Sequence, residues 1–351
     1  MKVGLIGYNS VGKSTLYRAA ARGQAKGEIT AVPVPDERFD AIVEQVKPKK
    51  ATPATVIIHD DIEDAQGGSK MFSQRFIDDA KKMDLLLHVV RAFESPMAPF
   101  HVAVDPLRDQ EAIDVELVLA DLQVVENRLT KLEKSLTVKQ PGSADYMDKM
   151  VFQRLHEPLE NGTPIRALEL TEDEQTIVRN YQFLSAKPMV VAFNVGEGDA
   201  ANPPANFLAR IEELSKKATP AFCVSAPMEE EIAQLDPADQ PEFLSSMGLT
   251  EPASAKVIRA VYDALGLITF FTAGENDTRA WPLRRGSSAL KAAGTIHTDI
   301  AKGFIRAEIV HYKEYKAAGS LDAAYSAGKM SLEGKDYVIQ DGDLLHIRNK
   351  S

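Results

Sequence analysis

The stretch GYNSVGKS at residues 7–14 decides the fold. It follows the apolar run KVGLI at residues 2–6 and precedes TLYRAAARG at residues 15–23, whose composition is typical of a helix. The pattern G-x4-G-K-S is complete and stands after a strand and before a helix, as a phosphate-binding loop requires. Its glycines let backbone N–H groups surround a phosphate, and the helix start favours an anion. The stretch therefore predicts a P-loop that holds a nucleotide.

The predicted nucleotide contacts lie in this loop and at two later strand ends. Lys13 would neutralise the outer phosphates, and the Ser14 hydroxyl would be a ligand of Mg²⁺. The runs that end in NVGE at 194–197 and SAP at 225–227 stand where G proteins carry N-K-x-D and S-A-x, the motifs that read the base. The expected contacts are Asn9, Ser10, Val11, Gly12, Lys13, Ser14, Thr15, Asn194, Val195, Glu197, Ser225, Ala226 and Pro227.

The apolar runs along the chain predict a parallel sheet. Several are nearly continuous rather than alternating, which is typical of strands that are buried on both faces. Helical stretches separate them, and this order predicts a doubly wound α/β fold of the P-loop NTPase class. The runs are KVGLIG (2–7), ATVIIHD (54–60), LLLHVV (85–90), MVVAFN (189–194) and AFCVSA (221–226).

Residues 112–185 interrupt this order with two helical stripes. The first has apolar residues at alternating spacings of three and four, which defines a heptad seam. The second stripe follows the turn PGS at 141–143. A narrow seam with charged flanks favours an antiparallel hairpin that projects from the α/β domain, over a pair of helices lying on the core or a dimeric coiled coil. The two stripes comprise Val115, Val118, Leu122, Val125, Leu129, Leu132 and Leu136, then Met147, Val151, Leu155 and Leu159.

From about Leu267 strand-like runs alternate with Gly- and Asp-rich turns, which predicts a small mixed sheet gripping one helix, SALKAAGTIH at 288–297. The expected domains are therefore residues 1–111 with 186–265 for nucleotide binding, 112–185 for the hairpin, and 266–351 for the C-terminal sheet. The runs are LITFFTAG (267–274), RAWPLRR (279–285), IRAEIVHY (305–312), KDYVI (335–339) and LLHIRN (344–349).

Charge and composition limit the function classes. The net charge is −10, yet the residues from Gly266 onward carry 12 Lys and Arg against 10 Asp and Glu. The acidic remainder argues against wholesale coating of nucleic acid, while the C-terminal part is compatible with a local RNA or ribosome contact.

A single cysteine, Cys223, excludes an internal disulfide. No run approaches a membrane span and MKVGLIG is not a signal peptide, so we expect a cytoplasmic protein. We also expect the protein to be a monomer.

Together, the motifs resemble the YchF-type Obg-like ATPases, a branch of the translation-factor-related P-loop GTPases, over essentially the whole chain. The resemblance implies a G domain with a coiled-coil insertion, a C-terminal β-grasp (TGS) domain, Mg²⁺ as cofactor, and a ribosome or RNA partner bound through the hairpin and the TGS-like domain. NVGE in place of N-K-x-D implies a preference for ATP over GTP. The matching stretches include GYNSVGKSTL (7–16), VPVPDERFD (32–40), HVVRAFE (88–94), LITFFTAGENDTRAW (267–281) and LEGKDYVIQDGD (332–343).

Two stretches depart from the family pattern. The threonine that closes over Mg²⁺ and the γ-phosphate has no counterpart in the short segment at 22–31, because Thr30 lies too close to the next strand. In place of the family's D-I-A-G the chain has DDIED at 60–64. Asp60 matches the Mg²⁺-ordering aspartate best, with Asp61 as the runner-up, which places Glu63 at the glycine position. Its charge there would repel a γ-phosphate.

These features lead to two hypotheses about activity. Lys13, Asp60 and His59 are the candidate catalytic residues, and Ser14 and Asp60 are the candidate metal ligands. An intact loop with altered γ-phosphate contacts predicts ATP or GTP binding with slow hydrolysis. The alternative is a non-hydrolysing regulator or scaffold, and a small-molecule kinase is disfavoured because it explains neither NVGE nor the C-terminal domain. The C-terminal part also has a candidate basic face, which either contacts phosphate groups or is only a solvated surface. Its residues are Arg284, Arg285, Lys302, Arg306, Lys335 and Arg348.

Overall fold

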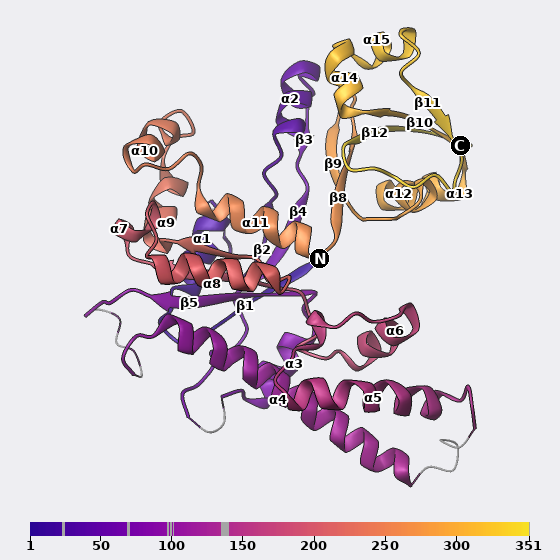
Figure 1. Ribbon diagram of the computed structural model, residues 1–351. Coiled ribbons are helices and arrows are strands. Elements are labelled where there is room, and N and C mark those ends of the chain that lie inside the picture. The colour runs from indigo at the N-terminus through magenta and orange to yellow at the C-terminus, as the bar shows by residue number, and fades with distance from the viewer. Residues whose placement is uncertain are drawn as a thin grey trace. The chain divides into compact units, whose positions relative to one another are not determined.

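The computed structural model describes residues 1–22, 25–68, 71–96, 98, 100, 102–134 and 140–350 (Figure 1). The chain divides into two compact units. The first comprises Met1–Thr30 and Ile57–Val257, and the second comprises Ala31–Val56 and Ile258–Ser351. The sequence assigns residues 31–56 to the nucleotide-binding domain, whereas in the structure they group with the C-terminal residues. The domain boundaries themselves stay a prediction.

The first sheet has the strand order β2-β4-β1-β5-β6-β7. The ladders that join β1 to β4 and β5, and β6 to β5 and β7, are all parallel. Every residue of β6 is buried, as expected of a strand that is covered on both faces. This arrangement confirms the doubly wound α/β fold. The strands are β1 Lys2–Ile6, β2 Ile29–Pro33, β4 Thr55–His59, β5 Leu85–Ala92, β6 Met189–Val195 and β7 Ala221–Val224.

Helices alternate with these strands along the chain. Helix α4 packs on β5, and α8 packs on β7. Among the described residues, no helix combines the length and the apolar character needed to cross a bilayer. The helices are α1 Lys13–Ala20, α3 Gln74–Lys81, α4 Pro106–Glu133, α5 Ala144–Glu160, α6 Glu172–Tyr181, α7 Glu197–Ala200, α8 Ala205–Lys216, α9 Ala226–Gln234, α10 Gln240–Ser246 and α11 Ala253–Ala264, with a short 3-10 turn at Ile165–Ala167.

Helices α4 and α5 form the predicted hairpin (Figure 1). Helix α4 begins at Pro106, before the expected boundary, because Asp105 caps it by accepting the Arg108 N–H at 3.1 Å. The seam prediction is wrong for Val115, which is 42% exposed and is not part of the buried core between the helices. Leu136 lies outside the described residues. The buried core of the hairpin comprises Val118, Val125, Val151, Phe152, Leu155, Leu159, Ile165, Val178 and Phe183.

A buried carboxylate ties the hairpin to the chain that follows it. Asp121 on α4 is 1% exposed and accepts the backbone N–H groups of Leu184 and Ser185 at 2.9 and 2.6 Å. Burial raises the pKa of Asp121 to about 6, although these hydrogen bonds act in the opposite direction. The folded state therefore binds a proton more tightly at Asp121 than the unfolded chain does.

We expect the stability contribution of Asp121 to fall as the pH rises. Its pKa is near 3.8 in the unfolded chain and about 6 in the folded one, so the stabilising proton is fully bound below the first value and lost as the pH passes the second. Two pKa units correspond to about 3 kcal/mol. Urea unfolding between pH 4 and pH 7 should show wild type losing roughly this much relative to Asp121→Asn, in which the group cannot titrate. Parallel pH profiles for the two proteins would contradict the assignment.

The second unit contains a mixed sheet with the strand order β11-β10-β12-β8-β9-β3. Strand β12 is parallel to β8, whereas β10 runs antiparallel to both β11 and β12. Helix α12 packs on this sheet, with Ala289 and Ala292 buried against Phe270 and Ile309. The elements are α2 Glu37–Val46, β3 Ala51–Thr52, β8 Leu267–Thr272, β9 Thr278–Arg284, α12 Ala289–Ile296, α13 Thr298–Lys302, β10 Phe304–His311, α14 Tyr312–Ala318, α15 Leu321–Ser326, β11 Ser331–Glu333 and β12 Asp343–Asn349.

Two expectations for this sheet are wrong. KDYVI at 335–339 is not a strand, because its backbone is hydrogen-bonded around the start of α12. The carbonyl groups of Tyr337 and Lys335 accept the N–H groups of Ala289 and Leu290 at 2.8 and 3.1 Å. The edge strand is instead β11, and the short helices α13, α14 and α15 accompany the one helix that was expected.

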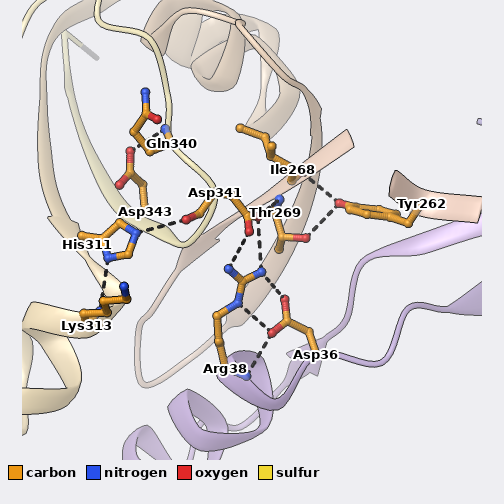
Figure 2. Close-up of polar contacts among 10 residues, drawn as sticks. All are labelled: Asp36, Arg38, Tyr262, Ile268, Thr269, His311, Lys313, Gln340, Asp341 and Asp343. Atoms are coloured by element: carbon orange, nitrogen blue, oxygen red, sulfur yellow. Dashed lines mark hydrogen bonds and ion pairs between the residues drawn. The ribbon is translucent and has the colours of Figure 1, made fainter. Parts of the chain in front are cut away.

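Arg38 joins residues 31–56 to the C-terminal sheet, and Figure 2 shows it between two carboxylates. Its Nε and Nη2 atoms donate to Asp36 at 2.9 and 2.8 Å, and Nη1 donates to Asp341 at 2.8 Å. Asp36 also caps α2, and Asp341 accepts the N–H of Thr269 at 2.8 Å. Hydrogen bonding to Asp36 raises the pKa of Arg38, which stays charged. Two distant stretches, 32–40 and 332–343, thus meet in one unit.

Candidate functional site

The candidate site is built on the loop between β1 and α1. Gly7 and Gly12 have φ values of 149° and 94°, in the region that favours glycine. A Cβ atom on Gly7 would lie 2.4 Å from the Val89 carbonyl oxygen. One on Gly12 would lie 2.2 Å from Nδ2 of Asn194. Both glycines of the predicted motif are therefore required by the backbone conformation and by the neighbouring strands.

Lys13 begins α1 and is 8% exposed. Its Nζ atom donates to the carbonyl oxygens of Tyr8 and Gly7 at 2.8 and 3.3 Å. It also forms an ion pair with Asp64 at 2.5 Å. An ammonium group has three N–H donors, so these three oxygens match its full hydrogen-bonding capacity.

Ser14 and Asp60, which the sequence predicts as oxygen ligands of a metal, lie close together. Asp60 lies just after the end of β4, and its carboxylate is close enough to the Ser14 side chain for Ser14 to lower its pKa. Burial raises the pKa of Asp60, while Ser14 and the charge of Lys13 counteract the rise. Asp61, the runner-up, contacts Nδ1 of His59 at 3.1 Å instead. The structure thus brings Asp60, and not Asp61, to the loop.

The donor set fits Mg²⁺, which takes oxygen ligands and is held by one or two protein groups together with phosphate oxygens and water. Ser14 supplies a hydroxyl and Asp60 a carboxylate from adjacent elements. In the described ranges no group of three or more His, Cys, Asp or Glu side chains is placed to bind a metal. The site therefore fits a metal that shares its coordination with a nucleotide, and does not fit an all-protein cage.

Asn194 links two parts of the site through its side-chain amide, and its expected role in reading the base stays a prediction. It is 1% exposed, its Nδ2 donates to the Val11 carbonyl at 2.9 Å, and its Oδ1 accepts the Ala226 N–H at 2.9 Å. The side chain therefore connects the phosphate loop to the start of α9. Val195 is buried, whereas Glu197 and Pro227 are exposed.

Other predicted residues lie around this arrangement. On the loop and α1, Asn9 and Ser14 are exposed and Thr15 is half-buried. Ser225 is buried, and its hydroxyl has no hydrogen-bond partner among the described residues. His59 is 8% exposed, and its Nε2 atom likewise has no partner there. The contact to Asp61 orients the His59 ring. It lies next to Asp60 in the chain, and its catalytic role stays a prediction.

Arg91 supports the loop and was not predicted as a site residue. It is 1% exposed, and its Nη1 donates to the Ser10 carbonyl at 3.1 Å. Its guanidinium lies over the rings of Phe93 and Phe100, 4.5 and 5.1 Å from their centroids. The available signal was an arginine inside the apolar run LLLHVVRA of β5. Such a residue, if buried, must find acceptors for its donors.

The segment after β4 passes close to the loop. Ala65 donates its N–H to the Gly7 carbonyl at 3.0 Å, and Tyr8 and Ala65 form a parallel β-bridge. Glu63, expected near the γ-phosphate, accepts from the Ser73 hydroxyl. The carboxylate that reaches Lys13 is that of Asp64, which the sequence did not single out. A cavity of about 530 Å³ opens beside the loop, lined by Asn9, Ser10, Glu63, Asp64, Ala65, Gln66, Gly67 and Phe100.

Comparison with known proteins identifies the family. The chain is 37% identical over 364 residues to the "Ribosome-binding ATPase YchF" of Bacillus subtilis (strain 168), with 99% of each chain covered. It is 33% identical to the human "Obg-like ATPase 1", covering 99% of this chain and 92% of that one. The chain belongs to the YchF/Obg-like ATPase family. The resemblance inferred from the motifs is confirmed.

Two further matches agree with this family. The model YchF-GTPase_C, described as "Protein of unknown function (DUF933)", matches residues 267–350. The solved "Structure of the Schizosaccharomyces pombe YchF GTPase" superposes with a TM-score of 0.88 at 30% identity, covering 99% of this chain and 97% of that one. The α/β class and the C-terminal domain of the YchF/Obg-like fold are thereby confirmed. The roles of the individual site residues stay predictions.

Proposed function

We propose that this chain is a P-loop ATPase that binds ATP, and less well GTP, together with Mg²⁺ and hydrolyses it slowly. The observation that carries the proposal is the convergence of Lys13, Ser14 and Asp60 on one glycine-shaped loop. The family supports it, because relatives over the full length are named ATPases. The preference for ATP rests on Glu197 standing where a guanine-reading aspartate would be.

The protein groups have separable roles in this proposal. The loop backbone and Lys13 bind and orient the phosphates, and most of the barrier reduction in phosphoryl transfer comes from such positioning and charge stabilisation. Ser14 and Asp60 would hold Mg²⁺, which neutralises charge on the phosphate oxygens. Asn194 and Arg91 keep the loop in shape through Val11 and Ser10. His59 would contribute through its Nε2 atom, which is buried and has no hydrogen-bond partner among the described residues.

A ribosome or RNA contact through the hairpin and the C-terminal unit is part of the proposal. It is supported by the name "Ribosome-binding ATPase YchF" of several relatives. The six residues of the predicted basic face are all exposed, as a phosphate contact requires. Arg348 and Lys302 also contact Glu308 and Asp299, which reduces their free charge. Cosedimentation with ribosomes at increasing salt would test the contact. The cytoplasmic location and the monomeric state stay predictions.

We expect Lys13→Ala to lower phosphate release at least tenfold, since loss of one transition-state charge contact costs roughly 1.4 kcal/mol or more. The measurement is a single-turnover assay in which excess protein meets trace γ-labelled ATP or GTP with Mg²⁺. Bound label and released phosphate are followed together. Release that does not depend on Lys13 would contradict the proposal and indicate a contaminating activity.

The second candidate function is a non-hydrolysing nucleotide-binding regulator or scaffold. The ion pair between Lys13 and Asp64 favours it, because Lys13 is engaged within the protein. In the same assay this alternative predicts bound label without released phosphate, in wild type as well as in the variant. Transfer of the label to an added metabolite would instead indicate a small-molecule kinase.

A further inference from the structure

Asp64 holds the lysine of the phosphate loop in the structure. Its Oδ1 atom lies 2.5 Å from Nζ of Lys13. The other two oxygens around Nζ are the Tyr8 and Gly7 carbonyls, which belong to the loop itself. A phosphate oxygen can gain a hydrogen bond from Lys13 only by replacing one of these three. Asp64 is the only charged partner among them and the only one on a different segment, so it is the partner that would have to leave.

Asp64 is held in place by its neighbours in the chain. Ala65 is 2% exposed and is hydrogen-bonded to Gly7, and Gln66 donates its N–H to the Met71 carbonyl at 2.9 Å. On the other side, Ile62 is 4% exposed and fills the space that a Cβ atom on Gly4 would occupy, 2.4 Å from that position. The Asp64 side chain is 41% exposed, but its position is set by the backbone of this segment. Its withdrawal from Lys13 therefore requires rotation of the side chain or release of this segment.

In P-loop proteins the loop lysine spans the β- and γ-phosphates. A diphosphate leaves the γ-side of Lys13 vacant, and a carboxylate can remain there as the third partner of Nζ. A triphosphate brings a negatively charged γ-phosphate to the same place. Two negative groups cannot share one ammonium at hydrogen-bond distance without strong repulsion in a partly dry site. The charge of Asp64 therefore acts more strongly against a triphosphate than against a diphosphate.

We propose that Asp64 takes the place of the γ-phosphate on Lys13, so that this chain prefers nucleoside diphosphates and admits a triphosphate only when Asp64 is displaced. The inference rests on the proposed nucleotide site. It makes Asp64 a specificity-determining residue of that site. It also gives a structural cause for slow turnover, because the form with Asp64 on Lys13 excludes the substrate.

The test compares the affinities of ATP and ADP, with Mg²⁺, for wild type, Asp64→Asn and a charge-matched control. Asp78→Asn on α3 removes one exposed carboxylate of the same unit, which accepts a hydrogen bond from Gln74. We expect Asp64→Asn to tighten ATP binding about tenfold and ADP binding less than about threefold, where tenfold corresponds to about 1.4 kcal/mol. The control should change both affinities by less than about twofold, because salt screens the charge of an exposed side chain.

Each other outcome has a distinct meaning. If no variant binds either nucleotide, the proposed function fails. If wild type binds and Asp64→Asn leaves the ratio of the two affinities unchanged, the inference is overturned while the function stands. Equal tightening of ATP and ADP would also overturn it, since Asp64 would then compete with the β-phosphate. Weaker ATP binding in the variant would show that Asp64 assists the triphosphate. Urea unfolding of each variant verifies that the variant is folded. We expect Asp64→Asn to fold, because the Asp64 side chain is half-exposed.

Discussion

Gly12→Ala should lower the affinity for ATP and ADP by about a hundredfold, equivalent to about 2.8 kcal/mol. The new Cβ atom would lie 2.2 Å from Nδ2 of Asn194, and that side chain cannot yield cheaply because it is bonded to Val11 and Ala226. The φ value of 94° adds strain for any residue with a Cβ atom, roughly 1 kcal/mol or more. The loop must therefore shift, and its N–H groups would no longer converge on the phosphates.

Equilibrium binding of both nucleotides, together with urea unfolding, checks this result. Gly198→Ala is the matched control, because a Cβ atom there meets no atom within 4 Å and its φ is not positive. We expect the control to bind as wild type does. Affinity of Gly12→Ala within about threefold of wild type, a difference of about 0.6 kcal/mol, would show that the phosphates are not held by this loop.

Asn194→Ala should destabilise the protein by about 3 kcal/mol even when no nucleotide is present. The change leaves two buried backbone groups, the Val11 carbonyl and the Ala226 N–H, without their partner. Each unsatisfied buried group costs about 1–3 kcal/mol. A side chain that served only to read the base would show no such effect, because its contacts would form only with the ligand. The prediction therefore separates a structural role of Asn194 from the role expected from the sequence.

The measurement is urea unfolding of the nucleotide-free protein. Asn202→Ala is the control, since Asn202 is exposed and surface substitutions usually change stability by less than about 0.5 kcal/mol. Equal unfolding midpoints for Asn194→Ala and wild type would contradict the structural role. A loss of affinity that accompanies the loss of stability would be expected, because Asn194 supports the loop through Val11 and lies against Gly12.

The sequence by itself determined the phosphate loop, the parallel sheet and the hairpin. These features are encoded locally, by glycines at fixed spacing, by continuous apolar runs and by a heptad seam. The pairing of Ser14 with Asp60 could also be predicted, because both follow from short motifs that begin at the ends of β1 and β4. Periodicity failed at Val115, where a residue in register with the seam faces solvent.

Only the tertiary structure decided which side chains meet across the chain. Residues 31–56 join the C-terminal sheet through the pairing of β3 with β9 and through the ion pair of Arg38 with Asp341, which are 303 positions apart. Asn194 is used to connect the loop to α9, and the carboxylate on Lys13 comes from Asp64 and not from Glu63. Such pairings depend on the direction in which a loop leaves its strand, and on which buried donors still lack an acceptor. Neither property is carried by residue type and spacing alone, so the composition of the site could be read from the sequence while its connections could not.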